Sequence, residues 1–217
     1  MNLKENILNI IYPNVCGICG KINEEYICKK CYIKIKDNLK CNIKKYGKEK
    51  YFQKHIYMCK YEGIIRKKII DYKFNNQAYL YKMFAHIILQ NKKICVRLKM
   101  YDIIIPVPIH KKREKQRGYN QSYLIAKELQ KNIKEITINN NAIVKIKNIK
   151  PQSELSKLQR EKNVKDAYKV KNIEKIIGKK ILILDDIYTT GSTVRECSKK
   201  LIEAGCKTVD ILTIAKD

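Results

Sequence analysis

One segment of the 217-residue chain places phosphate-binding and sugar-binding side chains next to each other. It reads ILILDDIYTTGSTVRECSKKL, residues 181–201, and has two carboxylates, Asp185 and Asp186, directly after four apolar residues. A hydroxyl-rich turn around Gly191 then leads into a predicted helix, where backbone N–H groups and the helix N-terminus attract phosphate. Carboxylates repel phosphate, so we expect them to hold sugar hydroxyls or a divalent metal. Together these features describe a site for a ribose 5-phosphate.

This segment has two other interpretations. An ordinary strand–turn–helix with a Ser/Thr cap is the simplest alternative. A Walker-type nucleotide site is excluded because the chain has no Gly-Lys-Ser/Thr triplet, and it has no G-x-G-x-x-G fingerprint. Residues 181–217 hold six acidic and five basic residues, so we expect a phosphate bound here to be held by backbone amides and hydroxyls.

A basic segment, HKKREKQRGYNQS at residues 110–122, follows a short apolar run that ends in two prolines. It carries two of only six arginines in the chain, and the forked guanidinium group suits a pyrophosphate better than a lysine does. The alternative is a solvated charged loop in front of a helix. The candidate residues for a pyrophosphate-binding side of the site are Arg113, Arg117, Gly118, Asn120 and Gln121.

The N-terminal cysteines have the spacing of a metal site. Cys16-x-x-Cys19 and Cys28-x-x-Cys31 are separated by eight residues, and four thiolates can close a tetrahedron around structural Zn²⁺. A redox or disulfide role is the alternative. Three further residues, Cys41, His55 and Cys59, suggest a second, incomplete metal site or simply reduced cysteines in a degenerate module.

The elements that position these residues follow from hydrophobic periodicity. Alternating strands and helices indicate an α/β fold with a parallel sheet. Apolar spacing predicts two helices within residues 61–100, divided near Asn75, and a further helix at about 121–134. The other expected elements are strands at 102–106 and 142–147, a long polar loop with some helix at 148–180, a strand at 181–184, a helix at about 192–203 and a strand at 208–214.

Composition limits the class of protein. A chain that is 45% hydrophobic can bury a core, and no apolar run reaches the 18 or so residues that cross a bilayer. The N-terminal residues do not have the pattern of a signal peptide. The net charge of +26 suits polyanions, but lysine is spread so evenly that codon bias is an equal explanation. Only the cluster at 111–117 is locally informative.

Two blocks resemble known families. Residues 181–193 resemble the phosphoribosyl diphosphate (PRPP) signature of type I phosphoribosyltransferases. PVP followed by RGYNQS resembles the ComF family of bacterial DNA-uptake proteins (ComFC-like), with Tyr119 in place of a Phe. Further resemblances to this family are Tyr72-Lys73-Phe74, Gln152 and Leu155 before Arg160-x-x-Asn163, and Ala167-Tyr168. Many ComF proteins carry a second pair of C-x-x-C motifs, which this chain lacks.

The resemblance implies a type I phosphoribosyltransferase-like parallel sheet flanked by helices (61–217) after a small zinc-ribbon-like module (1–60). It implies that Asp185 and Asp186 hold the ribose and Mg²⁺, and that Gln152, Arg160 and Asn163 belong to a flexible loop over bound PRPP. Lys73 is a further site candidate, or a solvated lysine. The residues expected to bind the 5-phosphate are Thr189, Thr190, Gly191, Ser192 and Thr193.

For function, the resemblance implies a DNA-uptake protein of natural transformation. We expect it to bind PRPP with Mg²⁺ and single-stranded DNA, and to meet uptake proteins such as a competence helicase. The alternatives are an active phosphoribosyltransferase with an unknown acceptor, and a ligand sensor that has lost the chemistry. We expect a cytoplasmic location, including peripheral association with the inner face of the membrane.

Overall fold

The computed structural model describes residues 14–47, 51–149 and 156–217. Its helices are α2 (Lys29–Ile35), α3 (Gly63–Phe74), α4 (Leu80–Leu89), α5 (Lys92–Leu98), α6 (Lys111–Arg117), α7 (Gln121–Asn132), α8 (Lys157–Val164) and α9 (Ser192–Glu203), with a 3-10 turn at Ile173–Lys175. Its strands are β1 (Asn42–Lys45), β2 (Lys54–Lys60), β3 (Ile103–Pro106), β4 (Ile143–Lys145), β5 (Tyr168–Val170), β6 (Lys180–Tyr188) and β7 (Thr208–Lys216).

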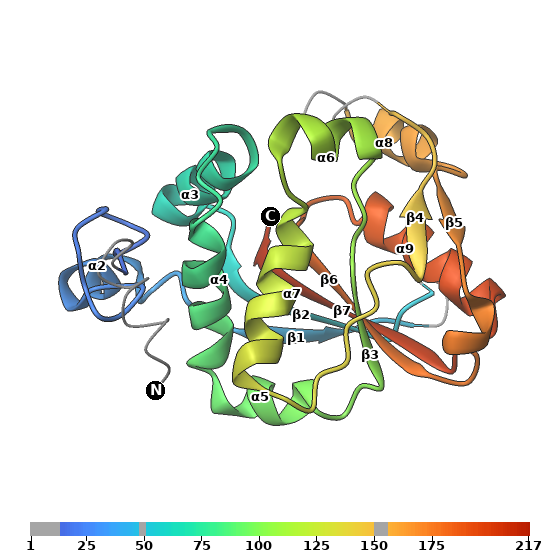
Figure 1. The fold of residues 1–217 in the computed structure, drawn as a ribbon, viewed down its shortest axis with the longest axis horizontal. Helices are drawn as coiled ribbons and strands as arrows, with labels where there is room; N and C mark the ends of the chain where they lie inside the picture. The colour runs from blue at the N-terminus through green and yellow to red at the C-terminus, as the bar shows by residue number, and fades with distance from the viewer. Residues whose placement is uncertain (1–13, 48–50, 150–155) are drawn as a thin grey trace.

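A five-stranded sheet in the order β1-β2-β7-β6-β3 forms the centre of the molecule (Figure 1). Strands β2, β7, β6 and β3 are parallel, and β1 pairs antiparallel with β2 at one edge. Parallel strands covered on both faces read as continuous apolar runs, as residues 181–184 of β6 do. The expected α/β class, with a mostly parallel sheet flanked by helices, is therefore confirmed.

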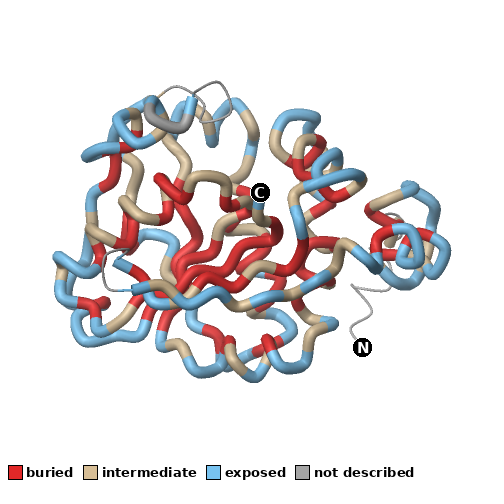
Figure 2. The backbone as a smooth tube through the Cα atoms, turned by 180° about the vertical axis from the view of Figure 1, so that it is seen from behind, coloured by how far each residue is buried: buried red, intermediate tan, exposed pale blue. Residues whose placement is uncertain are grey.

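Alternation along the strands divides the core between the two faces of the sheet. Leu182 and Leu184 belong to one apolar cluster, which includes residues of α4, α5 and α7. Ile181 and Ile183 belong to the other, which includes residues of α9, β4 and β5. The buried strands lie between these layers, and exposed backbone forms the outer surface (Figure 2). Helices on both faces leave the carboxyl ends of the parallel strands free to build a site.

Several segments differ from the elements expected, among them residues 92–98, which form a third helix in the region where two were predicted. Residues 111–117, for which a solvated loop is the alternative interpretation, form helix α6. The strand expected at 142–147 exists as β4, but it pairs antiparallel with β5 in a separate two-stranded sheet. Within the expected polar loop at 148–180, the described residues form α8, β5 and a 3-10 turn. The expected strand at 142–147 and some helix within 148–180 are thus present, whereas β5 is too short and α6 too charged for their periodicity to predict them.

The N-terminal region contributes to the main sheet. Strand β2 pairs in parallel with β7, so two strands N-terminal to residue 60 belong to the central sheet. The part that holds the cysteine pairs ends before β1, and we propose that the metal module is confined to about residues 14–41. This module packs against α4, because a Cβ on Gly17 would lie 2.6 Å from Met83 Sδ. Among the described residues, no helix has the length and apolar character required to cross a bilayer.

Candidate functional site

The turn between β6 and α9 has the form of a phosphate-binding loop. Gly191 has φ +75°, and a Cβ there would lie 2.3 Å from Tyr188 Oη, so only glycine fits this position without displacement. The Thr190 and Ser192 hydroxyls are 2.6 Å apart, and α9 begins at Ser192. Backbone N–H groups at the start of this twelve-residue helix are available to an anion.

The two carboxylates lie within β6 itself, because this strand continues to Tyr188. Asp186 is 5% exposed, and its Oδ1 is 2.8 Å from Lys73 Nζ of α3. Asp185 Oδ1 accepts a hydrogen bond from Ser122 Oγ at 3.4 Å. Burial raises the pKa of Asp185 to about 7, the charge of Asp186 adds to the shift, and Lys73 opposes it. The structure thus brings Lys73 to the predicted carboxylate pair.

The basic segment reaches the same place through α6 and the start of α7. Arg113, Arg117 and Gln121 line the pocket beside the carboxylates. Burial lowers the pKa of Arg117, and the charge of Asp186 opposes this shift. Gln121 is 3% exposed, and its Nε2 has no hydrogen-bond partner among the described residues. A bound ligand that accepts a hydrogen bond from this amide would satisfy a buried donor.

Gly118 and Asn120 shape the turn between α6 and α7. Gly118 ends α6 with φ +83°, a conformation that favours glycine. The Asn120 side chain caps α7 by accepting from Tyr123 N at 3.2 Å, and it donates to Val107 O at 3.0 Å. Neither residue is among those that line the pocket, and the contacts described here belong to the local fold.

The segment expected to close over a ligand is partly described. Helix α8 begins at a capping box formed by Ser156 and Gln159. Arg160 Nη1 donates to Thr189 Oγ1 at 3.0 Å, which joins α8 to the phosphate-binding loop. Asn163 lies in α8 and is not among the residues that line the pocket. Gln152 lies outside the described residues.

These elements enclose a pocket of about 340 Å³ at the carboxyl ends of the parallel strands. Four of the six arginines in the chain line it. Among the charged lining residues, six cations face three carboxylates: Arg66, Lys73, Arg113, Arg117, Lys145 and Arg160 against Asp185, Asp186 and Asp217. The expectation that amides and hydroxyls alone hold a phosphate here is thus incomplete. Segments distant in sequence bring positive charge to the loop, and the pocket suits a ligand that carries several negative charges.

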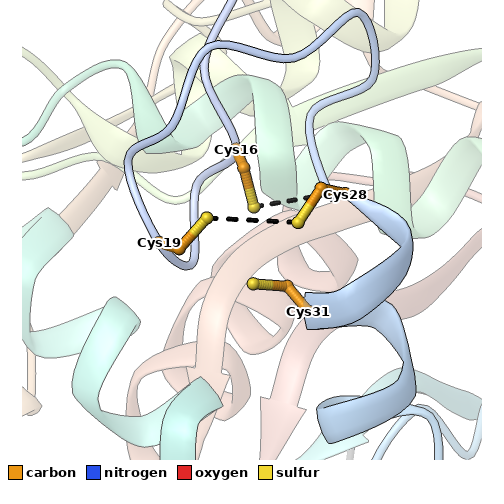
Figure 3. A group of neighbouring side chains, drawn as sticks. All are labelled: Cys16, Cys19, Cys28 and Cys31. Carbon is orange, nitrogen blue, oxygen red and sulfur yellow. Dashed lines mark hydrogen bonds between the residues drawn. The ribbon is translucent and has the colours of Figure 1, made fainter.

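The four N-terminal cysteines form one group. Their Sγ atoms all lie within 4.8 Å of one another, and they converge from a loop and from the start of α2 (Figure 3). Cys28 N donates to Cys16 Sγ at 3.4 Å, and a hydrogen bond of this kind stabilises a thiolate that binds a metal. Two cysteines of the group are buried, and each pair is separated by only two residues. Four thiolates arranged in this way fit a structural metal such as zinc.

Cys41, His55 and Cys59 do not gather into a second group within the described ranges. His55 Nε2 is 2.8 Å from Thr213 Oγ1, and its ring stacks on Tyr188 with centroids 4.3 Å apart. Cys59 Sγ donates to Ile214 O at 3.2 Å. Both side chains are fully buried and have protein partners, in agreement with a structural role for them.

Comparison with known proteins identifies the chain. Residues 118–217 match the phosphoribosyl transferase domain family. The chain is 30% identical to competence protein F of Haemophilus influenzae over 149 residues, which is 67% of this chain and 65% of that protein. It is 24% identical to competence protein ComFC of Bacillus subtilis over 91% of this chain and 75% of that protein. It is also 23% identical to DNA utilization protein YhgH of Escherichia coli, over 93% and 90%. The chain is a ComFC-like protein of the phosphoribosyltransferase superfamily.

Sequence reasoning missed several pocket residues of this ComFC-like chain. Lys145 and Tyr168 come from β4 and β5, Ser122 from α7, and Tyr61 and Arg66 from the segment around the start of α3. Ser122 ends the RGYNQS block and Tyr168 is part of the Ala-Tyr element of the resemblance, but neither was named as a site residue. Lys145, Tyr61 and Arg66 belong to no motif with recognised spacing. The sequence signal that could have indicated Arg66 is the scarcity of arginine, because four of the six arginines line the pocket.

Proposed function

We propose that this chain binds PRPP, or a closely related phosphorylated ribose, together with Mg²⁺ in the pocket at the β6–α9 turn. The observation that carries the proposal is the gathering of four of six arginines around a hydroxyl-rich loop and a carboxylate pair. Arginine forks suit phosphate and pyrophosphate, while the loop suits a single phosphate and the carboxylates suit a diol. PRPP carries all three of these groups.

Each part of the ligand would meet a different set of residues. Thr189, Thr190, Gly191, Ser192 and Thr193 would hold the 5-phosphate. Asp185 and Asp186 would hold the ribose hydroxyls, and their oxygens fit Mg²⁺, which would neutralise charge on the pyrophosphate. Arg113 and Arg117 would hold the pyrophosphate, and the unpaired amide of Gln121 would donate to the ligand. Lys73 would hold the Asp186 side chain in its orientation through their ion pair.

We further propose that the chain acts in DNA uptake and handles incoming single-stranded DNA in the cytoplasm. The support is the competence and DNA-utilization names of its relatives, together with a net charge of +26. Basic side chains give sequence-independent affinity, and exposed tyrosines can stack on unpaired bases. Zn²⁺ at the four cysteines would hold the small N-terminal module in its fold.

Binding is tested by calorimetry with PRPP and Mg²⁺. We expect the parent chain to bind PRPP and the Asp185→Asn/Asp186→Asn double variant to lose most of this affinity. Glu174→Gln replaces an exposed carboxylate away from the pocket, so this control variant should bind as the parent does. A parent chain that does not bind PRPP, ribose 5-phosphate or pyrophosphate contradicts the ligand proposal. For DNA, anisotropy with a labelled single strand should show affinity that falls steeply with salt. No binding at low salt would contradict that part.

An active phosphoribosyltransferase is the second candidate. The placement of Arg113 and Arg117 near the carboxylates favours it, because cations there would stabilise a departing pyrophosphate. The test is release of pyrophosphate from PRPP across a panel of nucleobases and amines. Release that depends on one acceptor supports transfer, and its absence with all acceptors supports a binding protein or a ligand sensor.

A further inference from the structure

Lys145 is a cation of the pocket wall that the ligand assignment above leaves without a role. It is the last residue of β4, and in the β4–β5 register it lies directly across from Tyr168. Its Nζ is 5.4 Å from the centroid of the Tyr168 ring, and both residues line the pocket. Tyr168 is 3% exposed, so this ring is a fixed support for the lysine side chain.

The ammonium group forms no ion pair with a described residue, although the charge of Asp185 favours its protonated form. The pocket's other lysine, Lys73, is paired with Asp186 at 2.8 Å. In contrast, no carboxylate in the described part of the chain lies within salt-bridge distance of Lys145 Nζ, and Arg113 adds a like charge nearby. A half-buried cation that lacks an ion pair is costly, and an anionic ligand would reduce that cost.

The neighbours of Lys145 place it beside the phosphate-binding loop. Thr193, the last residue of that loop, lines the pocket together with Tyr168, and its side chain opposes the rise in the pKa of Tyr168. At the other end of the loop, Arg160 donates to Thr189. The loop itself carries no basic residue, so these two segments bring a cation to each of its ends.

We propose that Lys145 is a further binding residue of the pocket, whose ammonium group pairs with the phosphate monoester held by residues 189–193. This assignment rests on the proposed function and deepens it, because it adds a charged contact to a subsite otherwise built from amides and hydroxyls. The ligand class is a sugar phosphate with a terminal dianionic phosphate.

Binding should then be coupled to the protonation of Lys145. Burial lowers the pKa of Lys145 to about 8, and Arg113 on α6 adds to the shift. A phosphate dianion would raise this pKa again, so above about pH 8 binding takes up a proton and weakens by up to about tenfold per pH unit. Phosphate is already ionised there, since its second pKa is about 6.

The other groups that face Lys145 do not titrate in this window. Asp185 on β6 has its pKa raised to about 7, so it is ionised above pH 8. Burial raises the pKa of Cys197 on α9 and of Tyr168 on β5 well above their ordinary values, so both remain neutral. The pH window from 8 to 9.5 therefore reports on Lys145.

The experiment is calorimetric titration with ribose 5-phosphate at pH 7.5 and pH 9, in two buffers of different ionisation enthalpy. We expect Lys145→Met to lower affinity by about tenfold or more at pH 7.5 and to abolish proton uptake at pH 9. Lys145→Arg, whose charge is permanent, should bind at both pH values without proton uptake. Lys147→Met, an exposed lysine two residues away, is the matched control and should behave as the parent.

The outcomes separate the two proposals. If the parent binds ribose 5-phosphate but Lys145→Met binds within twofold of it, the Lys145 assignment is wrong and the proposed function stands. If the parent binds neither ribose 5-phosphate nor PRPP, both are overturned. If Lys145→Met does not fold, the comparison of the parent with Lys145→Arg still tests the assignment. Equal proton uptake by these two proteins on binding at pH 9 would overturn it.

Discussion

Replacing Gly191 by alanine tests the geometry of the phosphate-binding loop. The residue has φ +75°, and the new Cβ would lie 2.3 Å from Tyr188 Oη and 2.4 Å from its Cζ. The Tyr188 ring cannot easily retreat, because it is 7% exposed and stacks on His55 at 4.3 Å. His55 is itself fully buried and bonded to Thr213. The loop must therefore move away from its place at the start of α9.

The cost has two sources. A non-glycine residue in the left-handed region costs about 1–2 kcal/mol. An overlap that displaces a packed aromatic ring or the loop costs about 1–3 kcal/mol more. We therefore expect Gly191→Ala to lower the free energy of unfolding by about 2–5 kcal/mol. It should also weaken ribose 5-phosphate binding, because the backbone N–H groups no longer converge.

The assay is urea unfolding at neutral pH together with ligand titration. Gly178→Ala is the matched control, since Gly178 has φ +69° and open space around it, so it should cost only the backbone strain. In a Tyr188→Leu background, Gly191→Ala should cost about 1–2 kcal/mol, because the overlapping ring atoms are gone. If Gly191→Ala and Gly178→Ala lower stability equally in the parent, the packing argument is refuted.

Three other predictions concern the metal, the carboxylate and the helix contacts. The purified chain should hold about one Zn²⁺ and lose it in Cys28→Ser; elemental analysis that finds almost none in the parent contradicts the four-cysteine site. Because the folded pKa of Asp185 is about 7 and its ordinary value is 3.8, the protonated form stabilises the fold. The unfolding free energy of the parent, relative to Asp185→Asn, should thus fall as pH rises from about 4 to about 7; urea curves with a constant difference at pH 5 and pH 8 would rule this out. Tyr72 is fully buried and donates to Gln121 O at 2.8 Å, so Tyr72→Phe should cost about 1–2 kcal/mol in urea unfolding, and no loss would mean that this bond is not formed.

Local signals in the sequence were sufficient for the centre of the fold. The apolar run of residues 181–184, the hydroxyl-rich turn and the helix after it correspond to β6 and α9. Strand β2 was not predicted, because polar residues such as His55 and Lys54 interrupt its pattern. It is a strand because it pairs with β7, which lies at the other end of the chain, and no local pattern records such a partner.

In the pocket, too, local sequence signals predict some residues, whereas others depend on the packing of distant segments. Arg113 and Arg117 were predicted because they lie in one basic segment that also resembles a known family. Arg66 and Lys145 were not, because each reaches the pocket only through the packing of α3 or of the β4–β5 pair. Among 41 lysines spread along the chain, the resemblance singles out Lys73, whereas only the topology selects Lys145 as a pocket residue.

The most direct test of the central claim is a crystal structure of the chain grown with PRPP and Mg²⁺. We expect the 5-phosphate on the loop of residues 189–193, the ribose hydroxyls against Asp185 and Asp186, and the pyrophosphate toward Arg113 and Arg117. A structure in which PRPP lies elsewhere, or in which its pyrophosphate occupies the loop and its ribose does not reach the carboxylates, would contradict this account.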